Sequence, residues 1–307
     1  MVNPADTLLV DRSERGKLAL TGSEAKEFMH GQVTNDVEGL TEGAGCYAAF
    51  LTHKGKMLGD LRILDAGDEL LLDCERVALQ ELFNMIRHYK LGRDVELHKR
   101  TLERGLLSLL GPDARRIAGA AELPADEHSH RAGELAGAPV RLIATDLGVD
   151  VLCDAADTER VAAALADAGA VRASEADAEV RRVETGRPRY GVDLDDTVIP
   201  QEAGLNDRAV SFEKGCYVGQ ETVARLHFRG KPNRHLRGLK LSGPAGHGDP
   251  LRLGEREVGR LGSVVESPVH GRIALALVRR EAAPGDSLAV GDDGVRAEVV
   301  ELPFAQA

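Results

Sequence analysis

The sequence predicts an α+β protein that ends in a small antiparallel β-barrel or β-sandwich. Before residue 230, strand and helix patterns follow one another without the strict alternation of a doubly wound parallel sheet. After residue 230 the chain contains only short apolar runs, separated by Gly, Pro and Asp at nearly regular intervals. This texture is typical of small antiparallel barrels, so the boundary near residue 230 is the firmest one.

Residues 1–104 have the pattern of strands combined with two amphipathic helices. A strand is expected over 17–20, and Thr21 and Glu24 have the spacing of a capping box that would begin a helix. Apolar residues recur at helical spacing in the later stretch that carries Leu82 and Ile86. The remaining expected elements are strands over 47–51, 57–64 and 69–73 and a helix over 75–91.

Residues 105–229 repeat the opening order of strand, turn and short helix, which predicts a second α+β unit. Two β-branched runs, 140–145 and 149–153, predict a hairpin. Residues 119–137 are rich in Ala, Gly and charge and predict a loop or a weak helix, with His128 and His130 as solvated side chains. Further helices are expected over 159–168 and from Ser174, and residues 230–307 supply strands over 236–241, 251–253, 258–265, 273–278, 287–290 and 295–300.

The composition excludes several function classes. The chain has 307 residues and a formal net charge of −11, which disfavours a phosphate-binding surface over the whole protein. Aromatic residues make up 3% and Trp is absent, so stacking platforms for single-stranded nucleic acid are not expected. Four widely spaced cysteines predict neither disulfides nor a metal site. No apolar run approaches the ~18 residues that span a bilayer, and we expect a cytoplasmic monomer without membrane contact.

The most unusual run of residues is 214–221, KGCYVGQE. Glycines near Cys216 let the backbone turn tightly, and the ammonium of Lys214 would favour a thiolate if the two groups lie close together. A lone cysteine that packs as a small apolar residue is the alternative. Residues 225–240 contain six basic and no acidic side chains, which predicts either an anion-binding patch or a solvated linker.

This octapeptide resembles the signature of the YgfZ-type folate-binding proteins, which are relatives of the glycine-cleavage T-protein. Four other segments resemble the family in order and approximate spacing: 28–37, 49–61, 184–205 and 223–233. The resemblance implies a three-domain cloverleaf with ferredoxin-like α+β domains and a C-terminal antiparallel β-barrel, arranged around a pocket for tetrahydrofolate or another reduced folate. It also implies a role in assembly or repair of iron–sulfur clusters, with iron–sulfur proteins or the assembly machinery as partners.

The resemblance also implies roles for single residues. Cys216 would be the residue tied to activity, assisted by Lys214. A carboxylate can accept two parallel N–H bonds from an aminopyrimidine ring, and the residues placed near the pterin by similarity are Asn35, Asp36 and Glu184. Tyr47 or Tyr190 would replace the tryptophans that some family members place against the pterin. The basic stretch that includes Arg229 would meet the glutamate tail.

One departure from the family pattern leaves the activity open. Aminomethyltransferases of the family have two consecutive aspartates after a glycine-containing turn, and the first is catalytic. Here Asp60 fills the second place, while the first is Gly59, which cannot carry a proton. Two alternatives to the iron–sulfur role therefore remain: a folate-dependent aminomethyltransferase, and a scaffold protein that makes a weak contact with tRNA through its basic stretch.

Overall fold

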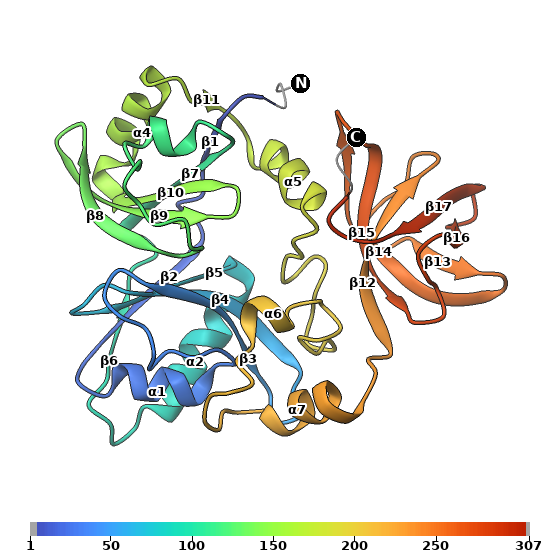
Figure 1. Ribbon diagram of the computed structural model, residues 1–307, viewed down its shortest axis with the longest axis horizontal. Coiled ribbons are helices and arrows are strands. Elements are labelled where there is room, and N and C mark those ends of the chain that lie inside the picture. Colours follow the sequence, from blue (N-terminus) through green and yellow to red (C-terminus); the bar gives the residue numbers. More distant parts are fainter. Residues whose placement is uncertain (1–4, 305–307) are drawn as a thin grey trace.

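The computed structural model describes residues 5–304, which form three lobes around a common centre (Figure 1). Two lobes combine a β-sheet with helices, and the third is a closed six-stranded β-barrel. The expected α+β fold with a C-terminal antiparallel barrel is therefore confirmed. Within residues 5–304, none of the helices has the length and apolar character that a bilayer crossing needs.

The first lobe is an antiparallel five-stranded sheet covered on one face by helices α1 and α2. Its strands, in spatial order, are β3 (Gly45–Leu51), β4 (Met57–Asp65), β5 (Leu70–Cys74), β2 (Gly16–Thr21) and β6 (Glu96–Lys99). The helices are α1 (Ala25–Gln32) and α2 (Leu79–Tyr89). The expected capping box is wrong: Thr21 ends β2, and the Glu24 carboxylate accepts a hydrogen bond from the backbone of Asp94 instead.

Alternation along the strands gives this sheet two different faces. On β4, Leu61 and Ile63 belong to the apolar core under α1 and α2. Asp60 and Arg62 alternate with them and therefore point to the opposite face. In the same register Arg62 lies across from Tyr47 on β3, so this second face carries polar side chains toward the centre of the molecule.

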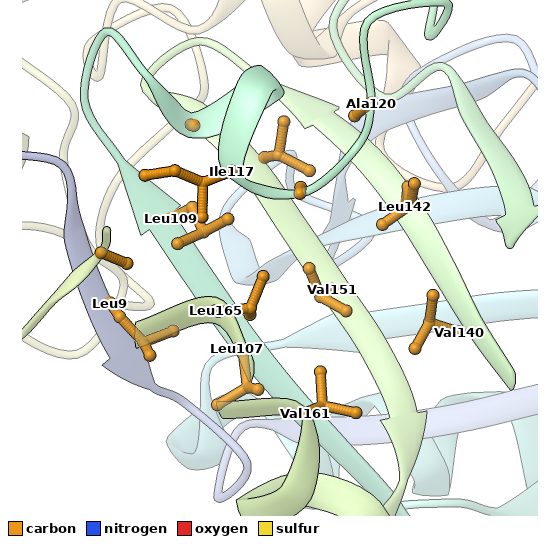
Figure 2. Packing of buried hydrophobic residues seen from close by; sticks show 14 of the residues in the cluster. Leu9, Leu107, Leu109, Ile117, Ala120, Val140, Leu142, Val151, Val161 and Leu165 are labelled. Atoms are coloured by element: carbon orange, nitrogen blue, oxygen red, sulfur yellow. The ribbon is translucent and has the colours of Figure 1, made fainter. Parts of the chain in front are cut away.

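The second lobe is a mixed six-stranded sheet that includes the first strand of the chain. In spatial order its strands are β11 (Val171–Arg172), β1 (Leu8–Asp11), β7 (Arg104–Leu110), β10 (Gly148–Asp154), β9 (Ala138–Thr145) and β8 (His130–Leu135). Figure 2 shows Leu9 of β1 in one core with Leu107, Val151 and Leu165 of α4 (Thr158–Asp167). The predicted continuous domains were 1–104, 105–229 and 230–307. They assign β1 to the first domain, whereas β1 belongs to the sheet of the second lobe.

The hairpin of β9 and β10 has the predicted position, but the segment before it differs from the expectation. Residues 130–135 form strand β8, which pairs with β9. The two histidines of this segment are buried, with 8% of His128 and 3% of His130 exposed. Their interpretation as solvated side chains was wrong because the segment lies against Ala44 and Gly43 of the first lobe.

Helix α5 (Glu175–Glu184) runs between the second lobe and the barrel (Figure 1). It begins at Ser174 as expected, and the side chains of Ser174 and Asp177 form a capping box there. Its Arg182 donates hydrogen bonds to Asp193 and to Ser263, which lies in the barrel. The barrel strands, in spatial order, are β12 (Arg234–Leu241), β15 (Gly271–Arg279), β14 (Arg256–Ser267), β13 (Pro250–Leu253), β16 (Ser287–Val290) and β17 (Val295–Val300).

The segment between α5 and the barrel returns to the first lobe. It includes the short helix α6 (Asn206–Ala209) and α7 (Gln220–Arg229). Tyr217 and Val223 pack with Leu51 of β3 in one apolar cluster. This packing holds the loop that contains KGCYVGQE against the turn between β3 and β4.

Candidate active site

A central cavity of about 190 Å³ lies where the two sheets, α5 and α6 come together, and it is open to solvent. This volume is smaller than the roughly 300–1,000 Å³ that is common for small-molecule sites, so a ligand of that size would extend out of the opening. The lining includes seven arginines and five carboxylates: Arg12, Arg15, Arg62, Arg182, Arg187, Arg189 and Arg208, with Asp60, Asp73, Glu75, Asp146 and Asp150. Tyr47, Tyr190 and His128 also line it.

Tyr47 and Asp60 both line the cavity and are joined by a hydrogen bond. The Tyr47 hydroxyl donates a hydrogen bond of 2.7 Å to Asp60 Oδ2, and Asp60 is only 6% exposed. Burial raises the pKa of Asp60 to about 6; the bond from Tyr47 opposes this shift and the nearby Glu75 carboxylate adds to it. Burial and Asp60 also raise the pKa of Tyr47 well above its ordinary value, so the phenol keeps its proton.

Ion pairs join the two sheets beside this contact. Arg62 of β4 donates to Asp73 Oδ2 at 2.6 Å and to Asp150 Oδ2 at 2.8 Å, and Asp150 belongs to β10 of the second lobe. Arg15 donates to the other oxygen of Asp73. Although burial opposes the shift, Arg62 and Arg15 lower the pKa of Asp73 to about 2. These charges are therefore paired with one another and fix the distance between the sheets.

Several polar atoms in the cavity wall lack a hydrogen-bond partner within the described residues, although one of them, Arg189 Nε, lies 3.6 Å from Glu75 Oε1. They are both ring nitrogens of His128 and the Nε atoms of Arg189 and Arg208. Burial and the charges of Arg62 and Arg208 lower the pKa of His128 to about 3, so its imidazole is neutral near pH 7. A polar ligand with both donors and acceptors would satisfy such atoms, and the aminopyrimidine ring and carboxylates of a reduced folate have this chemistry.

Comparisons with known proteins agree with this architecture. Residues 5–214 match the GCVT N-terminal domain, and residues 234–306 match the glycine cleavage T-protein C-terminal barrel domain. The chain belongs to the glycine cleavage T-protein family. An aminomethyltransferase from Rubrobacter xylanophilus is 30% identical over 96% of this chain and 82% of its own length.

Two further relatives of this family member cover nearly the whole chain. A candidate chloroplastic transferase from Arabidopsis thaliana is 28% identical over 97% of this chain and 71% of its own length. The crystal structure of glycine cleavage system aminomethyltransferase T from Bartonella henselae superposes with a TM-score of 0.87. That match covers 98% of this chain and 87% of the other at 22% identity, so it supports the fold.

Two of the residues expected to bind the cofactor lie in the cavity, namely Tyr47 and Tyr190. Asn35 does not line the cavity. Its side-chain amide donates hydrogen bonds to the backbone oxygens of Tyr47 and Arg208, which do line it, and so positions both residues. Asp36 does not line the cavity; its Oδ1 accepts a hydrogen bond from the Gly39 backbone and lies 3.2 Å from His30 Nδ1.

The other two expected cofactor residues lie outside the cavity. Glu184, in the last turn of α5, accepts a hydrogen bond of 2.6 Å from Ser267 of the barrel, because this side of α5 faces β14. Arg229 is exposed at the end of α7. Arg234 and Arg237 of the same basic stretch pair with Glu202 and Glu301. The cationic groups of the cavity come instead from the connection between β1 and β2, from β4, from α5 and the segment that follows it, and from α6.

The signature loop also lies outside the central cavity. Cys216 is exposed, and neither it nor Lys214 lines the cavity. The Lys214 ammonium donates to the backbone oxygens of His30, Val33 and Asn35 at the end of α1, which uses its three hydrogens. Lys214 therefore fastens the loop to the first lobe, and the expected assistance to a Cys216 thiolate has no support in its contacts.

The packing around position 59 explains why this residue is a glycine. A Cβ atom at this position would lie 2.6 Å from carbon atoms of the Phe50 ring and 2.7 Å from the Ala78 Cβ, in the core under α1 and α2. The acidic group that this strand presents to the cavity is the next residue, Asp60. One pattern in the sequence could have indicated this residue: Asp60 and Arg62 alternate with apolar residues along β4, as on a strand with one polar buried face.

Proposed function

We propose that this protein binds tetrahydrofolate or another reduced folate in the central cavity. The observation that carries the proposal is the buried Asp60 carboxyl, held by Tyr47, on the floor where the lobes meet. An ionised carboxylate accepts two parallel N–H bonds from an aminopyrimidine ring. Tyr47 and Tyr190 would flank the ring, and the arginines of the wall would attract the carboxylates of the tail.

The same residues can hold and move a proton. With a pKa of about 6, Asp60 is mostly ionised near pH 7 and can accept a proton without a large cost. Tyr47 orients this carboxyl, and Asn35 fixes the backbone of Tyr47. A bound reduced folate would supply the one-carbon carrier chemistry. The residues of the chain would then bind the folate, orient it, and hold or transfer a proton at Asp60.

The finer proposal is that the protein is of the YgfZ type and serves iron–sulfur cluster assembly or repair through Cys216. Its support is the KGCYVGQE loop and the exposure of this thiol. Burial raises the pKa of Cys46 and of Cys74 to about 12, and Cys153 is buried as well, so Cys216 is the accessible thiol. In this proposal folate and thiol act at separate places, and iron–sulfur proteins are the partners.

Calorimetry of the reduced protein with tetrahydrofolate, under anaerobic conditions, tests the first proposal. We expect one-to-one binding at micromolar affinity, about −8 kcal/mol. Asp60→Asn removes the ionised acceptor and should weaken binding at least about tenfold. Arg229→Ala, on the exposed end of α7, is the matched control and should bind like the wild type. Absence of binding by the wild-type protein would contradict the proposal.

A complementation assay tests the role of Cys216. Cys216→Ala should fail to restore the activity of cluster-containing enzymes in a deletion strain, while keeping tetrahydrofolate affinity and thermal stability. Restoration equal to the wild type would contradict the iron–sulfur proposal. Loss of folate affinity would instead show that the thiol acts through the cavity.

Aminomethyl transfer is a second candidate, favoured by the place of Asp60 in the cavity and by the relative named as an aminomethyltransferase. Formation of methylenetetrahydrofolate from an aminomethylated lipoyl carrier, above a control without enzyme, would support it. A weak contact with tRNA is less favoured, because Arg234 and Arg237 are paired. Its test is a salt-dependent affinity that falls in Arg229→Ala.

A further inference from the structure

His128 is a buried polar side chain of the cavity wall that has no hydrogen-bond partner among residues 5–304. It is 8% exposed, and both of its ring nitrogens are unpartnered within the described residues. The nearest carboxylate oxygen, Glu127 Oε1, is 3.5 Å from Nε2, which is too far for a good hydrogen bond. Buried polar groups normally have a partner, so this side chain points to a ligand of the cavity.

A second buried donor of the cavity wall lacks a hydrogen-bond partner within residues 5–304. Arg208 Nε is buried without a partner, although the other end of this guanidinium pairs with Glu127, the neighbour of His128 in sequence. The guanidinium carbon lies 5.2 Å from the centre of the Tyr47 ring, and the hydroxyl of that ring bonds Asp60. Arg208 and the Asp60 carboxyl therefore both contact the Tyr47 side chain, and His128 lines the same cavity.

The charges that face His128 make it a neutral group. Arg62 of β4, Arg208 of α6 and Arg187 after α5 disfavour its protonated form, and Asp73 of β5 favours it. Burial adds to the effect of the arginines, and the pKa of His128 falls to about 3. A neutral imidazole offers one N–H donor and one acceptor. Together with Arg208 it supplies at least two donors to a ligand near Asp60.

We propose that His128 and Arg208 donate hydrogen bonds to the 4-oxo oxygen of a 2-amino-4-oxopteridine whose N3–H and 2-amino group face Asp60. This assignment rests on the proposed binding of reduced folate. The 4-oxo group and N3–H are adjacent on the ring, so their protein partners must belong to one cavity, and all three of these residues line the central cavity. The glutamate tail lies at the other end of the ligand and cannot reach this cluster at the same time.

This arrangement makes the 4-position a specificity determinant. A 4-amino analogue replaces the acceptor by a donor, which would face the N–H of Arg208, and it also lacks the N3–H that faces Asp60. Arginine has no acceptor and does not lose its proton in proteins, so the mismatch cannot be repaired there. A site that bonds one group of a ligand discriminates strongly against an analogue that leaves buried polar atoms unpaired.

Calorimetry with two ligands tests the assignment: tetrahydrofolate and its 4-amino analogue, both titrated under anaerobic conditions into the full-length protein. We expect the wild type to bind the 4-oxo compound at least about tenfold more tightly. His128→Leu should lose about tenfold in affinity for tetrahydrofolate and little for the analogue. His128→Asn keeps a donor and suits the backbone φ of 73°, so it should retain most of the preference. His88→Leu, an exposed histidine of α2, is the control.

The outcomes separate this inference from the proposal on which it rests. Binding of neither compound by the wild type would overturn the proposed function, and the assignment with it. Equal affinity of the wild type for both compounds would overturn the assignment alone and leave folate binding intact. Equal weakening of both compounds in His128→Leu would also overturn it, because the effect would then arise from packing.

Discussion

The central cavity and the signature loop differ in almost every physical respect. The cavity is built from charges that many separate parts of the chain contribute, and its arginines and carboxylates are largely paired. The loop is one continuous octapeptide on the surface, with an exposed thiol at Cys216. The features that are easiest to recognise in the sequence therefore lie outside the cavity, while the polar chemistry is concentrated inside it.

This difference indicates two sites with separate tasks. In the cavity, a substitution changes the pairing of charges that also hold the sheets together, so binding and stability are coupled. In the loop, Lys214 and the buried Tyr217 fasten the backbone, and the exposed side chain of Cys216 contributes little to packing. The predictions that follow test this separation, from the largest expected effect on stability to the smallest.

Arg62→Leu should have the largest effect. It leaves Asp73 and Asp150 buried without their shared partner, and breaking a buried ion pair typically costs about 3–5 kcal/mol. Urea denaturation followed by circular dichroism measures the loss. Arg229→Leu, at an exposed position, should change the free energy of unfolding by less than about 0.5 kcal/mol. Equal effects of the two substitutions would show that the cavity charges do not hold the lobes.

Gly59→Asp restores the aspartate pair of the aminomethyltransferases and should still destabilise the protein by about 2 kcal/mol or more. The new side chain would overlap Phe50 and Ala78 in the core and bury a carboxylate there. Gly31→Ala is the control, because a Cβ at this position of α1 meets nothing within 4 Å. It should stabilise the protein by about 0.5–1 kcal/mol. Unchanged stability of Gly59→Asp together with aminomethyl transfer would contradict this reading of the strand.

The same contrast explains how much could be predicted from the sequence. Local patterns predict the barrel, the hairpin of β9 and β10, and the helix that begins at Ser174, because alternation and capping depend on neighbouring residues. The place of β1 could not be predicted in this way. Its partner β7 lies about a hundred residues later, and its short apolar run fits either lobe.

The residues of the site also divide into those that the sequence could predict and those whose place depends on tertiary contacts. The resemblance led to Tyr47 and Tyr190, since aromatic side chains could be matched to a role in the family. His128 was missed because its burial depends on β8 and on contact with the first lobe, which no local pattern shows. Glu184 was placed at the pterin by similarity, but only the docking of α5 on the barrel decides which way it faces.

The pH dependence of stability should follow the buried histidines. The folded-state pKa values of His128, about 3, and His130, about 4, lie below the ordinary value of 6.5. The unfolded chain therefore takes up protons first, and stability should fall as the pH drops below about 6.5. The slope is up to about 1.4 kcal/mol per pH unit for each histidine. Asp60, whose pKa is raised to about 6, has the opposite sign and offsets part of this loss.

Urea midpoints at pH 7, 6 and 5 measure these contributions. His128→Asn should make the loss of stability below pH 6.5 shallower, and Asp60→Asn should make it steeper. A slope that neither substitution changes would show that these groups are solvated and ionise as in the unfolded chain. The exposed His88→Asn provides the matched control.

Cys216→Ala should have the smallest effect on stability, within about 0.5 kcal/mol, because the side chain is exposed. Under native conditions a thiol reagent should modify Cys216 quickly and the three other cysteines slowly, since burial raises the pKa of Cys46, Cys74 and Cys153. Loss of the fast phase in Cys216→Ala, with unchanged tetrahydrofolate affinity, would establish that thiol and cavity act separately. Protection of Cys216 from the reagent by added tetrahydrofolate would instead couple the two sites and contradict their separation.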